Sequence, residues 1–90
     1  MNLESGKYVL EFSANWCGPC NMFKTVFEKV KKEFNDITFV NIDVDSDKTN
    51  LAKKYGVMSI PTVILFEDGN EIKRNIGYMN EDEFKLFLKK

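Results

Sequence analysis

A pair of cysteines two residues apart constrains the fold of this chain more than any other feature. Cys17 and Cys20 are the only cysteines among the 90 residues, and they lie in the run Trp16–Cys20 (WCGPC). An apolar run, residues 8–12, precedes them, and apolar residues with helical spacing follow. A Cys-x-x-Cys pair in this context is typical of a redox-active motif. We therefore expect a strand that turns directly into a helix at the cysteines.

The residues between the two cysteines favour Cys17 as the nucleophile. Gly18 would let the turn close tightly, and Pro19 suits the first turn of a helix, because its missing N–H would have no partner there. Cys17 would then lie at the helix N-terminus, where free N–H groups and the helix dipole stabilise a thiolate. Thiols so placed have pKa values of roughly 3.5 to 7.5, against about 8.5 for a free cysteine. We expect Cys17 to be ionised and open to solvent, with Cys20 behind it.

Two other uses of a cysteine pair need to be weighed against redox chemistry. A static disulfide is typical of secreted chains, which usually carry several such bridges. A structural zinc ion needs four ligands, whereas the sequence has no histidine and no third cysteine. Zinc or an iron–sulfur cluster would therefore have to bridge two chains. Redox chemistry carried by the two sulfurs, with no metal or cofactor, fits the context better.

Composition and charge indicate a single small domain, residues 1–90. Apolar residues make up 43% of the chain, and the net charge is −1 with both signs interspersed. Such a balance does not indicate a partner that is a nucleic acid or an anionic membrane surface. No apolar run approaches the ~20 residues of a membrane span, and residues 1–7 lack the features of a secretory signal. We expect a cytoplasmic protein.

Apolar periodicity predicts the element order β-α-β-α-β-β-α. The expected strands are 8–13, 37–44, 62–66 and 71–76, and the expected helices are 19–34, 48–55 and a last one capped by Asn80. The first two strands should be parallel around a helical crossover, and the last two should form an antiparallel hairpin. Strands that are apolar on both faces need helices on both faces. We therefore expect an α/β fold with a mixed four-stranded sheet.

The chain resembles the thioredoxin family at three separated places. Trp16–Cys20 reproduces the family's active-site motif, and Gly56–Thr62 matches its second signature, in which the proline is cis. Asp68-Gly69 and Ile76-Gly77 fall at the family's hairpin turn and its later glycine. The resemblance runs from Tyr8 to the C-terminus. It implies a thioredoxin fold and a protein-disulfide reductase, here a short form without the family's usual N-terminal strand and helix.

The resemblance also implies roles for the cysteines and a binding surface beside them. Cys17 would attack a disulfide of a target protein, Cys20 would then release the reduced target, and a thioredoxin-reductase-type donor would restore the dithiol. Pro61 would follow a cis peptide bond, and Ile60 would pair its backbone with the target peptide. Trp16 would flank the docking groove rather than lie in the core. The other members of this apolar patch would be Gly18, Pro19, Gly77 and Tyr78.

Glu11 departs from the family, which usually has a buried aspartate six residues before the first cysteine. A glutamate here can be a solvent-facing residue on an exposed edge, or a carboxyl buried behind the cysteines. Burial would raise its pKa, and it could then exchange a proton with Cys20 near neutral pH. Phe39 replaces the lysine that the family often has nearby, so no group that offsets the desolvation is evident from the sequence.

The missing N-terminal elements would leave residues 37–43 as an uncovered edge strand. Residues 1–3 or a second copy of the chain could cover it; we expect a monomer, with a dimer through this edge as the alternative. Two other functions stay open. One is a pure binding role in which the thiols are incidental, although the retained cysteines, Gly18-Pro19 and Pro61 speak against it. The other is a dithiol donor dedicated to one enzyme, such as a ribonucleotide reductase or a peroxidase.

Overall fold

One four-stranded sheet forms the centre of the molecule. The computed structural model describes residues 5–89. Its strands are in the order β2-β1-β3-β4. The elements along the chain are β1 (Lys7–Ser13), α1 (Gly18–Lys31), β2 (Ile37–Asp43), the 3-10 turn η1 (Val44–Ser46), α2 (Leu51–Lys54), β3 (Thr62–Glu67), β4 (Asn70–Ile76) and α3 (Glu81–Leu88). Apart from η1, this is the predicted order.

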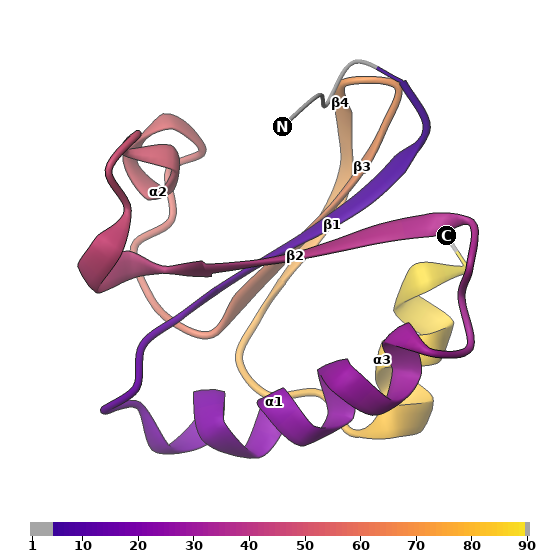
Figure 1. Ribbon diagram of the computed structural model, residues 1–90, viewed down its shortest axis with the longest axis horizontal. Helices are drawn as coiled ribbons and strands as arrows, with labels where there is room; N and C mark the ends of the chain where they lie inside the picture. Colours follow the sequence, from indigo (N-terminus) through magenta and orange to yellow (C-terminus); the bar gives the residue numbers. More distant parts are fainter. Residues whose placement is uncertain (1–4, 90) are drawn as a thin grey trace.

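Strand pairing confirms the mixed sheet expected from the sequence. β1 pairs in parallel with β2 and antiparallel with β3, and β3 pairs antiparallel with β4. The parallel pair places Glu11 opposite Asn41, and the central antiparallel pair places Glu11 opposite Val63. The helix α1 is the crossover between the parallel strands (Figure 1). Glu11 therefore lies in the interior of the sheet, with a strand on either side.

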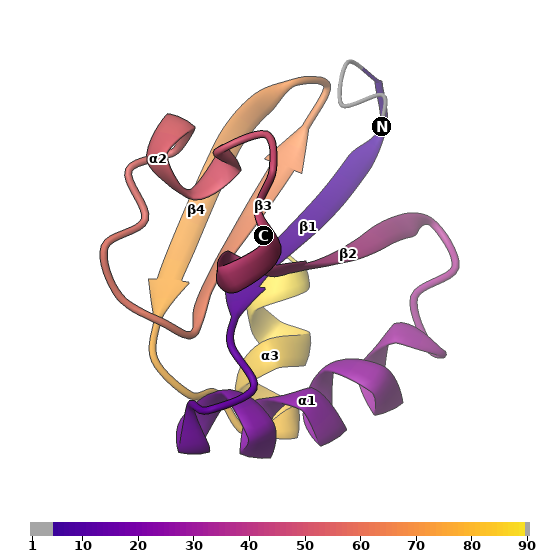
Figure 2. The same ribbon diagram turned by 60° about the vertical axis from the view of Figure 1, so that its left-hand side comes forward.

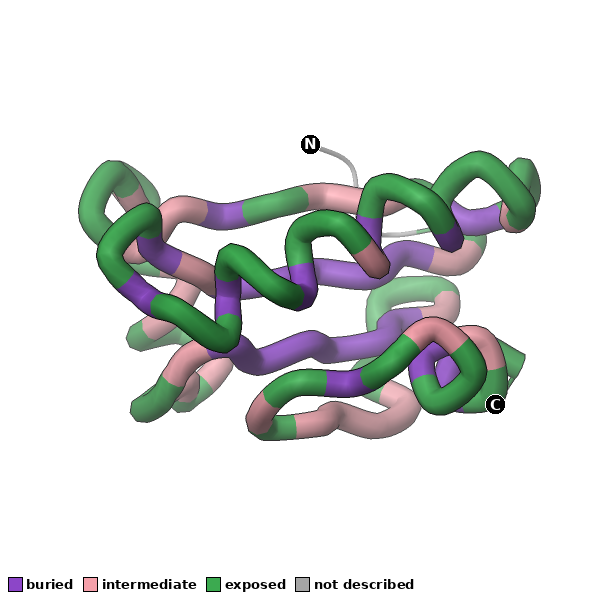
Figure 3. The backbone as a smooth tube through the Cα atoms, turned by 90° about the horizontal axis from the view of Figure 1, so that it is seen from below, coloured by how far each residue is buried: buried purple, intermediate pink, exposed green. Residues whose placement is uncertain are grey.

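Helices cover both faces of the sheet, as predicted. α1 and α3 lie together on one face, and α2 lies on the other (Figures 1 and 2). Each face has its own apolar cluster, one that joins Val9 and Val63 to Phe23 and Phe84, and one around Leu10 that includes the inner side chains of α2. The buried residues of the sheet are concentrated in its two central strands, β1 and β3 (Figure 3).

The second helix is shorter than predicted. The spacing predicted a helix over 48–55, but α2 spans Leu51–Lys54. Asn50 has a left-handed backbone (φ 55°), which a continuous helix does not allow. The carboxylate of Asp47 accepts hydrogen bonds from the N–H groups of Leu51 (3.0 Å) and Ala52 (2.8 Å), so Asp47, one of the residues expected to cap this helix, caps its later start. The helix α1 also ends before the predicted residue 34, and β2 ends one residue before the predicted 44.

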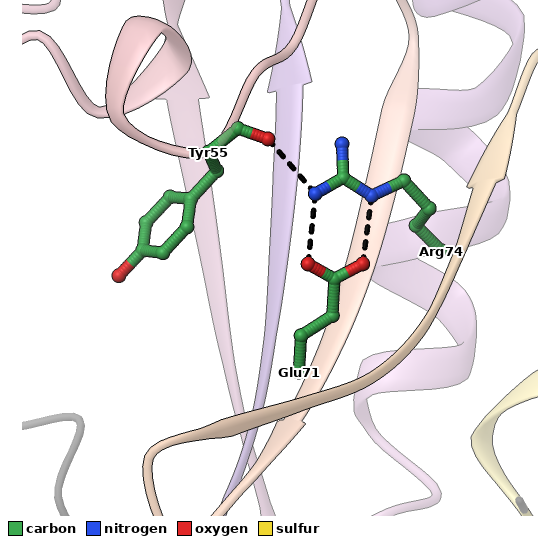
Figure 4. A network of polar contacts seen from close by, with 3 residues as sticks. All are labelled: Tyr55, Glu71 and Arg74. Atoms are coloured by element: carbon green, nitrogen blue, oxygen red, sulfur yellow. Dashed lines mark hydrogen bonds and ion pairs between the residues drawn. The ribbon is translucent and has the colours of Figure 1, made fainter.

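A polar network fixes the end of α2 against β4. The Arg74 guanidinium donates two hydrogen bonds to the Glu71 carboxylate, at 2.7 and 2.8 Å, and a third to the carbonyl oxygen of Tyr55 at 2.8 Å (Figure 4). The hydrogen bond from Arg74 lowers the pKa of Glu71. Because Tyr55 is the C-cap of α2, this network positions the segment that leads to Ile60 and Pro61.

The two edges of the sheet are β2, which was predicted as an edge strand, and β4. Within residues 5–89, β2 pairs with β1 alone, which matches the expected open edge. Residues 1–3, one of its two suggested covers, lie outside the described residues. The part of the chain that the structure describes contains no helix long and apolar enough to cross a membrane.

Candidate active site

The two cysteines lie at the start of α1 and are joined by a disulfide bond, with Cα atoms 5.2 Å apart. Cys17 is the N-cap residue and has an extended backbone (φ −92°, ψ 113°). Its sulfur accepts a hydrogen bond from the backbone N–H of Cys20 at 3.2 Å. A side chain at the N-cap normally accepts this bond through oxygen. In the reduced protein the same N–H would stabilise negative charge on the Cys17 sulfur.

The exposure of the cysteines corrects one prediction. Cys17 was expected to be open to solvent, but in this oxidised form it is 6% exposed, against 2% for Cys20. The two cysteines pack in a small apolar cluster with Ala14, Val44 and Ile60. The predicted order of exposure holds, but only a small part of Cys17 is accessible to solvent.

The two residues between the cysteines are exposed in the first turn of α1. Pro19 is in the helical first turn, as predicted. The reason given for Gly18 is wrong, because its φ is not positive and an added Cβ would meet no heavy atom within 4 Å. The turn does not need a glycine at this place. What Gly18 provides is a surface without a side chain next to Cys17.

Three segments that are distant in the sequence meet at this end of the sheet (Figure 2). The peptide bond between Ile60 and Pro61 is cis, as expected. The carbonyl oxygen of Ile60 lies 3.9 Å from Cys17 Sγ. The N–H of Gly77 donates a hydrogen bond to the carbonyl oxygen of Pro61 at 2.8 Å. Gly77 has φ 103°, a conformation that favours glycine. The segment around Pro61 and the later glycine, Gly77, therefore both help to build the surroundings of Cys17.

An apolar groove lies beside Cys17. Trp16 is 71% exposed, and its indole N–H donates a hydrogen bond to the Asp45 carboxylate at 2.8 Å. The groove has a volume of about 220 Å³. Its lining residues are Trp16, Val44, Ala52, Val57, Met58, Ser59 and Ile60. Trp16 is thus a surface aromatic held in place, as predicted, and Asp45 is the partner that the sequence did not indicate.

The exposed apolar surface is larger than the predicted patch. Tyr78 is 41% exposed and packs edge-on against Phe23, with ring centroids 6.4 Å apart. Met58 and Ile76, which the sequence analysis did not assign, are 96% and 65% exposed. Both are close in sequence to predicted site residues, since Met58 lies two residues before Ile60 and Ile76 precedes Gly77. This adjacency was the signal that could have found them.

Glu11 is buried rather than solvent-facing. Its side chain is 1% exposed, and Oε1 accepts a hydrogen bond of 2.7 Å from the Asn41 amide. Oε2 is buried and has no hydrogen-bond partner among the described residues. Burial raises the pKa of this carboxyl above 4.5, Asn41 lowers it in part, and the charges of Glu28 and Lys24 act in opposite directions. The expectation that nothing offsets the desolvation is therefore wrong.

A small cavity connects Glu11 with Cys20. Its volume is about 60 Å³, enough for at least one water molecule by the usual ~10–15 Å³ criterion. Its lining residues include Glu11, Ser13, Cys20, Lys24, Glu28 and Asn41. The buried carboxyl and the second cysteine thus face one polar space. Among residues 5–89, no cluster of three or more His, Cys, Asp or Glu side chains is placed to hold a metal ion.

Comparison with known proteins agrees with this arrangement. The family model named Thioredoxin matches residues 1–90. A thioredoxin of Mycoplasmoides gallisepticum is 43% identical over 83 residues, which cover 92% of this chain and 82% of that protein. A thioredoxin of Chlamydia trachomatis is 38% identical over 89 residues, covering 99% of this chain and 86% of that protein.

A solved structure shows that the fold is shared as well. A mutant thioredoxin from Halobacterium salinarum superposes with a TM-score of 0.86 at 34% identity, over 97% of this chain and 75% of that one. The superposition covers nearly all of this chain, which carries its Cys-x-x-Cys pair at the start of α1. The chain therefore belongs to the thioredoxin family, and it is a thiol-disulfide oxidoreductase of the protein-disulfide reductase type.

Proposed function

We propose that Cys17 is the attacking thiol and Cys20 the resolving thiol in the reduction of target disulfides. The observation that carries this assignment is the hydrogen bond from the Cys20 N–H to the Cys17 sulfur at the N-cap of α1. That bond and the helix N-terminus favour a thiolate on Cys17. Cys20 is the less exposed of the two and lies one helical turn further along, which suits an intramolecular second step.

The proposed reaction transfers two electrons from the cysteine pair to the target. The Cys17 thiolate attacks one sulfur of the target disulfide, whose S–S bond breaks and whose other sulfur leaves as a thiolate. Cys20 then loses its proton and attacks Cys17 Sγ. The mixed disulfide breaks, and the second target sulfur leaves as a thiolate. Both target thiolates take up protons, and Cys17 and Cys20 remain as the disulfide seen here.

Glu11 is the proposed acceptor of the Cys20 proton. Its unpartnered Oε2 and Cys20 belong to the walls of one cavity with room for water. Its raised pKa brings the carboxyl closer to neutral pH, where an acid–base group works best. In the reverse direction the protonated Glu11 would return the proton to Cys20.

The groove beside Cys17 is the proposed docking surface for targets. Trp16 and Ile60 line it, and the backbone of Ile60 would pair with an extended target segment. The next residue, Pro61, is buried and would hold Ile60 in position for this pairing. Gly18, Pro19 and Gly77 would complete the surface around the sulfur. The groove is mostly apolar, and hydrogen bonds between backbones do not depend on the side chains of the target. We therefore expect a broad range of disulfide-containing targets.

The proposed setting follows from the direction of electron flow. A protein that works as a dithiol reductant suits a reducing compartment, which supports the cytoplasm as its location. A thioredoxin-reductase-type protein is the proposed electron donor, so the chain would act as an electron carrier between it and the targets. We propose that residues 1–90 act as one domain and as a monomer.

The test is the reduction of insulin by a dithiol in the presence of each variant. Wild type should accelerate the reaction, and Cys17→Ser should be inactive because it lacks the attacking sulfur. Cys20→Ser should accumulate a mixed disulfide with the target, visible by non-reducing electrophoresis. Thr25→Ser, an exposed change further along α1, should match wild type.

Two outcomes would contradict the assignment. An inactive wild type would remove the reductase function and favour the pure binding role. Normal turnover by Cys20→Ser would remove the resolving role of Cys20. A comparison of several purified target disulfides would then separate a general reductase from a donor dedicated to one enzyme.

A further inference from the structure

Asn41 is an exposed residue of β2 whose side chain donates a hydrogen bond to the buried Glu11 carboxyl. We propose that Asn41 is a positioning residue for proton transfer: its amide holds one oxygen of Glu11 so that the other oxygen faces the cavity shared with Cys20. This inference rests on the proposed function of Glu11. It adds a second residue, which touches neither sulfur and acts only through the carboxyl.

The strand register places Asn41 for this role. Parallel pairing sets Asn41 of β2 directly opposite Glu11 of β1. The Asn41 Nδ2 atom donates to Glu11 Oε1 at 2.7 Å and to Ser13 Oγ at 2.9 Å. Both N–H groups of the amide can be used in these two bonds, which fixes its orientation. Asn41 itself is exposed, so it covers the buried carboxyl from the solvent side of the edge strand.

The two oxygens of Glu11 are left in different states. Oε1 is anchored by Asn41, whereas Oε2 is buried and has no hydrogen-bond partner among the described residues. The charged groups that act on Glu11 come from α1, where Lys24 and Glu28 line the same cavity. On the other side the partner in β3 is the apolar Val63. Asn41 is thus the one described side chain that donates a hydrogen bond to this carboxyl.

The hydrogen bond has a predictable effect on proton transfer. A donor to a carboxylate favours the charged form, so Asn41 opposes the effect of burial on the Glu11 pKa. Without Asn41, the carboxyl would stay protonated to a higher pH. It would then be unable to accept the Cys20 proton at pH values where the wild-type protein can.

The experiment compares Asn41→Leu and Asn41→Asp with wild type. The first readout is the NMR titration of the Glu11 carboxyl carbon in the oxidised protein, where the cysteines do not titrate. Leucine removes the donor, so the midpoint should move to higher pH. Aspartate also adds a like charge, so its midpoint should move further. Thr38→Leu, an exposed change on the same strand, should leave the midpoint unchanged.

The second readout is the pH profile of the resolving step, followed in a preformed mixed disulfide on Cys17. At a pH below the Glu11 midpoint measured for wild type, the step should be about tenfold slower in Asn41→Leu, the order expected for losing one hydrogen bond to a charged group. At a pH above the midpoints measured for both proteins, the rate should return to that of wild type, because Glu11 is then ionised in each. A residue with a merely structural role would change the two rates equally.

Failure of this inference can be told apart from failure of the proposed role of Glu11. If Asn41→Leu leaves both the Glu11 midpoint and the pH profile unchanged, Asn41 is not a positioning residue. If Glu11→Gln itself leaves the profile of the resolving step unchanged, Glu11 is not the proton acceptor, and the proposed function fails at that point. A midpoint that moves without any change in the profile overturns the catalytic part of the inference.

Discussion

Glu11→Gln should stabilise the oxidised protein at alkaline pH and lose this advantage at acid pH. The wild-type carboxyl is 1% exposed, with one hydrogen bond to Oε1 and none to Oε2 among the described residues. Glutamine has nearly the same shape and can accept the same bond from Asn41. It differs mainly in having no charge to bury. The pH dependence of the stability difference therefore isolates the cost of that charge.

The sign follows from the raised pKa of Glu11. Between pH 4.5 and the folded-state pKa, the folded protein holds a proton that the unfolded chain has already released. The stability contributed by this carboxyl is therefore complete below pH 4.5 and is lost as the pH rises through the folded-state pKa. Each unit of elevation corresponds to about 1.4 kcal/mol. At a pH above the folded-state pKa, Glu11→Gln should therefore gain this amount for each unit of elevation, because glutamine carries no charge to desolvate.

The measurement is urea unfolding of the oxidised protein at several pH values from about 4 to 9, which runs from the usual pKa of a glutamate carboxyl to well above neutral pH. Non-reducing conditions keep the Cys17–Cys20 disulfide intact, so Glu11 is the buried group that titrates at this site. The control is Asp36→Asn, an exposed carboxyl outside the lining of this cavity, which should stay within about 0.5 kcal/mol of wild type. If the difference between Glu11→Gln and wild type is constant over this range, the argument from a buried charge is refuted.

Two further predictions concern the elements that position the site. Arg74→Met should lower the free energy of unfolding by about 0.5–1.5 kcal/mol, because it removes the hydrogen bond to Tyr55 and the partly exposed pair with Glu71; an unchanged urea midpoint would contradict this. Asn80→Ala should cost about 1 kcal/mol, because it breaks the capping box in which Asn80 Oδ1 accepts from the Glu83 N–H at 2.8 Å. Glu83→Gln, which keeps both hydrogen bonds possible, should cost less, and equal losses would show that the cap is not the cause.

Features that depend on neighbouring residues could be predicted from the sequence. The capping box at Asn80 and the Asp68-Gly69 hairpin each need only a few consecutive residues, and both form as expected. The burial of β1 and β3 on both faces followed from apolar residues on both parities. The length of α2 was not predictable in this way, since the left-handed Asn50 and the cap from Asp47 interrupt a pattern that is helical in spacing.

Features that depend on how distant segments meet could not be predicted. The sequence placed Asn41 on a strand, but the pairing of Asn41 with Glu11 requires the register between β1 and β2, which the residues alone leave open. The burial of Cys17 likewise depends on Val44, from the 3-10 turn η1, and on Ile60, from the segment before β3. The cysteine motif predicted the helix start and the order of exposure, but not how closely the other segments surround the sulfur.

Burial disfavours negative charge on both the Cys17 sulfur and the Glu11 carboxyl, and in each case a hydrogen bond from one N–H group favours that charge. Negative charge on the Cys17 sulfur is supported by the backbone N–H of Cys20, and negative charge on Glu11 by the side-chain amide of Asn41. The first donor is a backbone N–H of the helix, so any residue at position 20 except proline would provide it. The second is a single exposed side chain on an edge strand. Substitution at position 41 should therefore change how readily Glu11 accepts a proton without changing the attacking sulfur. In this protein the resolving step is the one that a surface substitution can alter separately.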